Sequence, residues 1–294
     1  RYRFPAAGAD RDGHPSTTLY GKVYPDGSGD VVDGFLRALA REQSEHGVQY
    51  PARFPTPVAY VPAMRLLVTE ELAGEPLVPR LVKTVLAADS PAEDDSLLTA
   101  VRDSGRALAA LHGSDLATAP VRSAADELAA LRRDLELVTG VWPAVAEQVR
   151  RRIDLLPGGV PDAPDLVLSH GDFTPSQVLL DGHTPAVVDF DTLCWADPAL
   201  DLGRYLAQLE LLGLKFGGPS AGPLVELLIG EFLDGYGEAT ARAASGAAAA
   251  DRIAFFKATT LARTALNSCR QLKSYRLDLA LSLLDDVQAG RVDL

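Results

Sequence analysis

Five side chains that could take part in acid–base or metal chemistry lie within 22 residues of one another. They are His170, Asp172, Gln177, Asp189 and Asp191. Carboxylate and amide oxygens form a hard ligand set, which suits Mg²⁺ and phosphate better than zinc. This stretch of the sequence therefore predicts a site for phosphate chemistry.

Short apolar runs around these residues predict the strands that would position them. Residues 166–168, 177–180 and 186–190 have strand-like patterns, with a turn at Asp181-Gly182. Asp172 and Asp189 would then lie at corresponding ends of adjacent strands, with Gln177 beside them. The simpler alternative is that Asp and Gly only form turns here. Three acidic or amide groups in one fixed pattern favour the metal site.

The first quarter of the chain has the pattern of a small antiparallel sheet with one helix. Residues 6–13 are expected to form a turn, and residues 31–45 place apolar side chains at helical spacing. The expected strands are residues 1–4, 18–24, 55–61 and 66–71.

The rest of the chain is mainly helical in pattern. Residues 157–164 are expected to form a linker, and the low-complexity run 241–250 a loose loop. The expected helices are residues 96–112, 124–138, 142–155, 201–212, 224–237, 253–271 and 274–288. The sequence thus predicts an α+β fold with a small β-rich lobe, residues 1–73, and a larger helical lobe, residues 74–294.

Composition excludes several classes of function. The chain of 294 residues carries 28 basic and 40 acidic side chains, a net charge of −12, which argues against binding along a nucleic-acid backbone. No apolar run approaches the ~20 residues of a membrane span. Two cysteines, Cys194 and Cys269, are too few for a disulfide framework, so we expect a cytoplasmic protein.

The central motif resembles the catalytic loop of protein kinase-like enzymes. Residues 170–177 (HGDFTPSQ) follow the pattern H-x-D-x-x-x-x-N with Gln at the last position, and Asp189-Phe190 matches the start of D-F-G. The Gly after His170, the run 197–202 (DPALDL) and the run 107–112 (ALAALH) are similar to the aminoglycoside phosphotransferase and choline kinase-like family. The resemblance extends from Leu19 to about Leu206 and implies a two-lobed, protein kinase-like fold.

The resemblance implies a role for each matched residue. Asp172 would orient the acceptor hydroxyl and take its proton, while Gln177 and Asp189 would hold Mg²⁺ ions that bridge the phosphates of ATP. Asp191 is a further candidate metal ligand, directly or through a neighbour. Lys22, one of five lysines against 23 arginines, matches the lysine that binds the α- and β-phosphates. The alternative for Lys22 is a solvated strand lysine.

Other implied positions lie in the small lobe, which would bind the nucleotide. The helix acid that pairs with Lys22 would be Glu42 or Glu45, and the sequence does not choose between them. Backbone groups between the lobes would bind adenine, namely those of Glu70, Glu71 and Leu72. The family has a glycine-rich loop before the lysine strand, and this sequence shows none there. We expect the loop, with the first strands, to precede Arg1. The alternative is that the phosphates are less fully covered.

Two further features refine the resemblance. Gln177 replaces the usual Asn, as in the maltokinase-like and glucosamine kinase-like branch, and its amide oxygen lies one methylene further out. His170 is expected to be structural, bonding across the loop rather than acting as a base.

The leading hypothesis is an ATP-dependent phosphotransferase that acts on a hydroxyl of a small molecule, such as a sugar or an aminoglycoside. Its acceptor site would be flanked by the helices at residues 124–155 and 253–271, and an acidic pocket would suit an aminoglycoside. The alternatives are a catalytically silent or partner-dependent nucleotide-binding module, a kinase for a peptide Ser or Thr, and, less well supported, a metal-dependent hydrolase. No specific protein partner is indicated.

Overall fold

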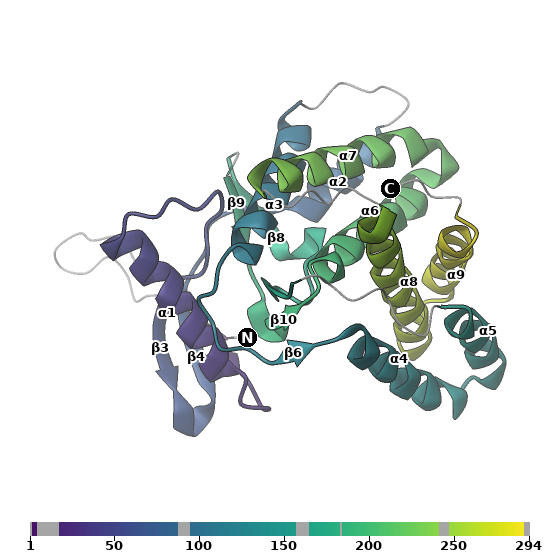
Figure 1. Cartoon of the computed structure of the whole chain (residues 1–294), viewed down its shortest axis with the longest axis horizontal. Coiled ribbons are helices and arrows are strands. Elements are labelled where there is room, and N and C mark those ends of the chain that lie inside the picture. The colour runs from purple at the N-terminus through teal and green to yellow at the C-terminus, as the bar shows by residue number, and fades with distance from the viewer. Residues whose placement is uncertain are drawn as a thin grey trace.

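The computed structural model describes residues 2–4, 18–87, 95–156, 165–182, 184–240 and 247–290 (Figure 1). A small sheet with one long helix lies on one side, and a larger group of helices lies on the other. The predicted α+β architecture with two lobes is therefore confirmed. The predicted turn at residues 6–13 and the predicted linker at residues 157–164 lie outside the described residues.

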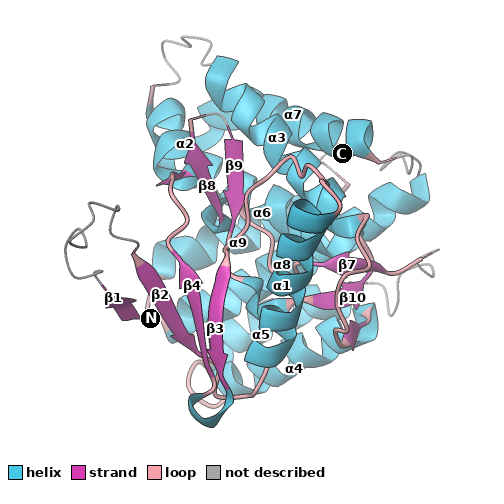
Figure 2. Cartoon of the chain, turned by 90° about the vertical axis from the view of Figure 1, so that its left-hand side faces the viewer, coloured by secondary structure: helices cyan, strands magenta, loops and turns pink. Residues whose placement is uncertain are grey.

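The small lobe is an antiparallel sheet in the order β1-β2-β4-β3. Its strands are β1 (Tyr2–Phe4), β2 (Leu19–Val23), β3 (Pro57–Val61) and β4 (Leu66–Glu70). Helix α1 (Gly29–Glu45) runs along this sheet (Figure 2). It buries Val32, Phe35, Leu36 and Leu39, the helical spacing that the sequence predicts.

Two further three-stranded sheets carry the central motif. One has the order β6-β10-β7 and the other the order β5-β8-β9. Their strands are β5 (Glu75–Pro76), β6 (Val121–Arg122), β7 (Val167–Ser169), β8 (Val178–Asp181), β9 (Thr184–Val187) and β10 (Cys194–Ala196). The loop between β7 and β8 and the segment between β9 and β10 hold the candidate catalytic residues.

The large lobe is built from helices. They are α2 (Leu77–Leu86), α3 (Asp95–His112), α4 (Ala124–Thr139), α5 (Pro143–Asp154), α6 (Ala199–Gly217), α7 (Gly222–Ala239), α8 (Ala247–Arg270) and α9 (Ser274–Gln288). None of the helices in the described part of the chain is long and apolar enough to span a bilayer.

Two helical segments differ from the prediction. Helix α2 was not expected, although Leu77, Leu81 and Val85 are buried along one of its faces; Pro79 falls in its first turn, where proline is tolerated. Helix α8 begins at Ala247, inside the run 241–250 that was expected to be a loose loop. Alanine has the highest helix propensity, so the alanine-rich end of this run forms the first turn of the helix.

Helix α6 lies at the centre of the large lobe and is buried on nearly all sides (Figure 1). Beside it, α3 and α7 pack closely because Gly105 has no side chain: a Cβ atom there would lie 2.1 Å from the carbonyl oxygen of Phe232. A stack of rings joins these helices to the motif, with Tyr205 and Phe232 centroids 3.8 Å apart and Phe173 5.5 Å from Tyr205. The core thus packs the motif loop against α6 and α7.

Candidate active site

The loop of residues 170–177 is held by a buried carboxylate on α6. Asp201 accepts hydrogen bonds from the backbone N–H groups of His170 (2.7 Å), Gly171 (2.9 Å) and Phe173 (3.3 Å). It also accepts from Nε2 of His112 at 3.3 Å. Burial alone would raise the pKa of Asp201, but the hydrogen bond and charge of His112, with other nearby cations, lower it below its ordinary value. An ionised Asp201 therefore fixes the loop backbone.

Gly171 lets this loop turn sharply next to the catalytic position. Its φ is +76°, a region that L-residues rarely adopt, and a Cβ atom would lie 2.1 Å from the carbonyl oxygen of Thr192. The hydroxyl of Thr192 in turn donates to the carbonyl of His170 at 2.9 Å. Both the positive φ and the close approach of the Thr192 carbonyl therefore favour glycine at position 171.

His170 has the structural role expected of it. Its buried ring donates from Nε2 to the carbonyl oxygen of Val188 at 3.0 Å, across the loop. The ring packs against Phe190, with centroids 4.9 Å apart, and Phe190 packs against Phe35 of α1 at 5.1 Å. This chain of rings connects the motif loop to the small lobe.

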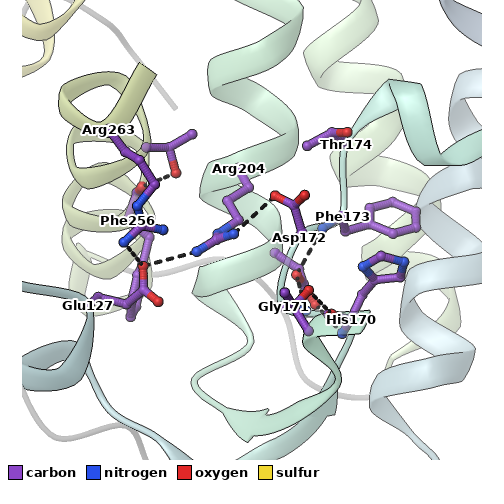
Figure 3. Close-up of polar contacts among 12 residues, drawn as sticks. Glu127, His170, Gly171, Asp172, Phe173, Thr174, Arg204, Phe256 and Arg263 are labelled. Carbon is purple, nitrogen blue, oxygen red and sulfur yellow. Dashed lines mark hydrogen bonds and ion pairs between the residues drawn. The ribbon is translucent and has the colours of Figure 1, made fainter. Parts of the chain in front are cut away.

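Asp172 projects from the loop and is half-exposed, with 49% of its side chain accessible. Its Oδ1 accepts a hydrogen bond of 3.0 Å from Nη1 of Arg204. Figure 3 shows the Arg204 guanidinium lying between Asp172 and Glu127. Arg204 therefore fixes one oxygen of Asp172 and leaves the carboxylate open to solvent.

Glu127 on α4 is the buried anion beneath these groups. Its Oε2 lies 3.0 Å from both Nη2 of Arg204 and Nη2 of Arg263, and its Oε1 lies 3.6 Å from Nε of Arg122. Burial would raise the pKa of Glu127, but the three arginines outweigh it and lower that pKa. The sequence analysis did not identify Glu127, because nothing in the local sequence marks it as the partner of these arginines.

Lys22 of β2 lies beside two carboxylates of the segment between β9 and β10. Its Nζ forms ion pairs with Asp189 and Asp191. Asp189 adopts φ 73° and ψ 54°, a left-handed conformation that costs energy in a non-glycine residue and is often associated with functional sites. The structure thus brings together three of the predicted residues from distant parts of the chain.

The two glutamates expected to pair with Lys22 are not its partners among the described residues. Glu42 lies near the C-terminal end of α1 and pairs with His46 at 3.4 Å, and Glu45 is exposed on the last turn. The face of α1 that reaches Lys22's cavity carries Val32 and Leu36 instead. The prediction for this helix acid is therefore wrong in this structure, because the turns that hold glutamates do not face the lysine.

A cavity of ≈ 370 Å³ lies between the small sheet and the motif. Five of the predicted residues line it: Lys22, Glu70, Leu72, Gln177 and Asp189. Its remaining lining residues are largely apolar and include Val32, Leu36, Leu67, Leu179 and Phe190. An apolar slot with charged groups at one end suits a planar base attached to phosphates.

The segment between the lobes offers only some of its backbone groups to this cavity. The amides of Glu70 and Glu71 donate to the carbonyls of Thr56 (2.9 Å) and Thr18 (2.8 Å). The Glu71 carboxylate accepts from the Tyr20 hydroxyl at 2.9 Å and does not line the cavity. In the described chain, no group accepts a hydrogen bond from the Leu72 amide, which leaves that amide for a ligand.

The oxygen-rich end of the cavity fits Mg²⁺ rather than zinc. Asp189 and Gln177 line it, and Asp191 shares the contact with Lys22. The described residues contain no group of three or more His, Cys, Asp or Glu side chains that could hold a metal alone. Mg²⁺ needs only one or two carboxylates when phosphate oxygens and waters complete its shell.

A second cavity of ≈ 220 Å³ opens beside Asp172. Ser176 lines both cavities, so they meet at the motif loop. The other residues that line the second cavity are Asp172, Thr174, Arg204, Gln208, Thr260, Arg263, Thr264, Asn267 and Arg276. Its walls are the motif loop and helices α6, α8 and α9, of which only α8 belongs to the segments expected to flank an acceptor site.

Comparison with known proteins identifies the family. A model described as "Phosphotransferase enzyme family" matches residues 13–250, which is most of the chain. The chain belongs to this family. No curated protein matches its sequence. Membership confirms the predicted relationship to the aminoglycoside phosphotransferases and the expected class of transferase.

Solved structures of other phosphotransferases share the fold. A glucosamine kinase in complex with glucosamine, ADP and inorganic phosphate is 20% identical, with a TM-score of 0.64 over 94% of this chain and 79% of that chain. A GDP complex of wild-type aminoglycoside 2'-phosphotransferase-IIIa is 15% identical, with a TM-score of 0.59 over 99% and 94%. Macrolide 2'-phosphotransferase MphH from Brachybacterium faecium is 22% identical, with a TM-score of 0.52 over 93% and 85%. These similarities confirm the kinase-like fold.

Proposed function

We propose that this phosphotransferase moves the γ-phosphate of ATP to a hydroxyl group of a small molecule. The observation that carries the proposal is the meeting of two cavities at the motif loop. One is a nucleotide-sized slot with Lys22 and Asp189 at its end, and the other is a polar cavity that contains Asp172. Residues 1–73 would bind the nucleotide, and residues 74–294 would supply the catalytic loop and the acceptor site.

Asp172 would act on the acceptor. Its carboxylate orients the hydroxyl and takes its proton as the hydroxyl oxygen bonds to the γ-phosphorus and the bond from that phosphorus to the bridging oxygen of ADP breaks. Arg204 holds one carboxylate oxygen at 3.0 Å, so Asp172 keeps a fixed orientation while its other oxygen stays available. Asp201 keeps the loop backbone in place throughout.

Lys22, Gln177, Asp189 and Asp191 would bind the phosphate end of ATP. Lys22 offers a cation to the phosphate oxygens, and the pairing with Asp189 and Asp191 keeps its ammonium beside the oxygen donors of the slot. Gln177 and the two aspartates are the oxygen donors that would hold Mg²⁺. When bound, Mg²⁺ neutralises charge that develops on the phosphates. The Leu72 amide and the Glu70 carbonyl would bind the adenine edge.

The geometry favours an active enzyme over a silent nucleotide-binding module. Asp172 is exposed toward a built cavity and is held by a buried arginine, an arrangement that a module without turnover does not need. The cavity beside Asp172 has a volume of ≈ 220 Å³, which suits a small molecule better than a peptide segment. If the protein were a metal-dependent hydrolase, Lys22 and the nucleotide slot would have no role.

An acceptor screen coupled to ADP release tests the proposal. Sugars, amino sugars, sugar acids and other hydroxylated metabolites are compared with ATP and Mg²⁺, and the phosphorylated product is identified by mass. Product formation from at least one acceptor, above the rate of ATP hydrolysis, supports the proposal. Nucleotide binding in a thermal-shift titration without any product would identify the chain as a silent module instead.

A further inference from the structure

We propose that the acceptor carries an anionic group, a carboxylate or a phosphate ester, and that Arg276 and Arg263 bind it. This inference rests on the proposed function and specifies its substrate class. The cavity is not the acidic pocket that would suit an aminoglycoside, because arginines outnumber carboxylates in its lining.

The charge of the second cavity is the first observation. Three guanidinium groups line it, from Arg204 on α6, Arg263 on α8 and Arg276 on α9, against the single carboxylate of Asp172. The remaining lining residues are neutral polar residues: Thr174, Ser176, Gln208, Thr260, Thr264 and Asn267. The chain as a whole has a net charge of −12, so this local excess of positive charge runs against its average.

The second observation is how these arginines are paired. Arg204 and Arg263 share the buried Glu127, and Arg263 also lies 4.0 Å from Asp134. Arg276 has no carboxylate partner within the described chain. Glu127 is itself shared with Arg122, so one anion offsets several cations. The cavity is left with positive charge that a bound anion would balance.

The chemistry of the lining selects the ligand. Guanidinium groups form paired hydrogen bonds with carboxylates and phosphates, and they repel ammonium groups. The hydroxyl and amide side chains around them can bind the hydroxyls of a polyol. The site therefore fits a hydroxylated acid or a sugar phosphate better than a neutral or amino sugar.

The arginines have another candidate role, which is to bind the γ-phosphate of ATP. Arg204 contacts Asp172 and therefore lies next to the transferred group, so it is not used in the test. Arg276 comes from α9 and lines the second cavity but not the nucleotide slot, which assigns it to the acceptor. A substitution of an arginine that binds the γ-phosphate should change the KM for ATP, whereas a substitution of one that binds the acceptor should change the KM for the acceptor.

The test compares glucose, glucosamine, gluconate and glucose 6-phosphate as acceptors, with Arg276→Gln against the wild type. We expect the two anions to be used at least 10-fold better in kcat/KM than glucose and glucosamine. In Arg276→Gln, loss of a charge-assisted hydrogen bond should lower kcat/KM for the anions by about 10–100-fold, mainly through acceptor KM. The KM for ATP should not change.

Arg270→Gln is the matched control. Arg270 is on the neighbouring helix, its side chain is 55% exposed, it pairs with Asp134 at 3.9 Å, and it does not line the cavity. This variant should keep wild-type kinetics for all four acceptors. A similar loss in both variants would mean that general charge, not the cavity, is responsible.

Other outcomes overturn the inference. Preference for glucose or glucosamine, or a change in the KM for ATP in place of the acceptor KM, contradicts it but leaves the proposed function standing. If no acceptor is phosphorylated, the proposed function fails, and calorimetric titration of gluconate and glucose 6-phosphate then decides the inference alone. Absence of binding, or binding that Arg276→Gln does not weaken, overturns it.

Discussion

Asp201 should be the residue whose charge most strongly holds the catalytic loop. Its carboxylate has two oxygens, and both are used twice: Oδ1 by the amides of Gly171 and Phe173, and Oδ2 by the amide of His170 and Nε2 of His112. The Asn side chain has one oxygen and one NH₂ group. In Asp201→Asn, the NH₂ group must therefore face either the amides of Gly171 and Phe173 or the amide of His170. On the second side His112 can accept from the NH₂ group, if its proton lies on Nδ1.

The size of the effect follows from this count. Each hydrogen bond to a charged group contributes roughly 1.5–3 kcal/mol, so losing one or two of them should destabilise the fold by about 1.5–6 kcal/mol. Proteins of this kind are stable by only about 5–15 kcal/mol, so the variant should fold but be marginal. Because the loop also loses its fixed backbone, turnover by the folded fraction should decrease as well.

Equilibrium unfolding in urea, followed by circular dichroism, measures the loss. Asp197→Asn is the control. Asp197 is also buried in the run 197–202, but it accepts a hydrogen bond from the Ala199 amide (2.9 Å), forms an ion pair with Arg252 (3.0 Å) and does not contact the loop. It should lose stability without the same loss of turnover. An Asp201→Asn protein within about 1 kcal/mol of the wild type would refute the reasoning.

The same carboxylate predicts a dependence of stability on pH. The pKa of folded Asp201 lies below its ordinary value of ~3.9, so its contribution is fully present above that pH. It is lost as the pH falls through the lowered pKa of the folded state. Asp201→Asn should therefore show a shallower loss of stability below about pH 4 than the wild type. Parallel acid unfolding curves would contradict this.

Three further predictions concern the site and its support. Lys22→Met should lower kcat/KM by about 100-fold or more, as for other removed charge stabilisers, with little change in unfolding; kinetics near the wild type would exclude its phosphate role. Gly171→Ala should destabilise the fold by about 2–5 kcal/mol in urea unfolding, because of its positive φ and the carbonyl of Thr192, whereas Gly222→Ala, which meets open space, should not. The Cys194 thiol, whose pKa burial raises to about 12, should resist thiol labelling at pH 8 until the protein unfolds, and rapid labelling would show that it is accessible.

The fold could be predicted largely because its elements have clear periodicity. The strands at β2, β3 and β4 and most helices follow local patterns of apolar residues, so their order indicates a small sheet before a helical lobe. Helix α2 was missed because the turn signals before it and Pro79 suggest a break, although its buried face has helical spacing. The start of α8 was missed because an alanine-rich run has no apolar pattern.

The centre of the site could be predicted because one local motif carries it. Asp172, Gln177 and Asp189 lie within one stretch of sequence, and the structure places them at the two adjoining cavities. Glu127 and the charge of the acceptor cavity depend on contacts between helices far apart in the chain. The pairing of Lys22 with Asp189 instead of Glu42 depends on which turn of α1 faces the lysine. Such contacts are set by tertiary packing and leave no local signal.

The central claim is that Asp172 takes the proton of an acceptor hydroxyl. Asp172→Asn tests it most directly, because the amide oxygen can still accept the hydrogen bond from Arg204 while the base is lost. With the best acceptor from the screen, kcat should fall by about 10²–10⁴-fold. The affinity for ATP, measured by calorimetry, should stay within twofold of the wild type. A kcat close to that of the wild type would contradict the claim.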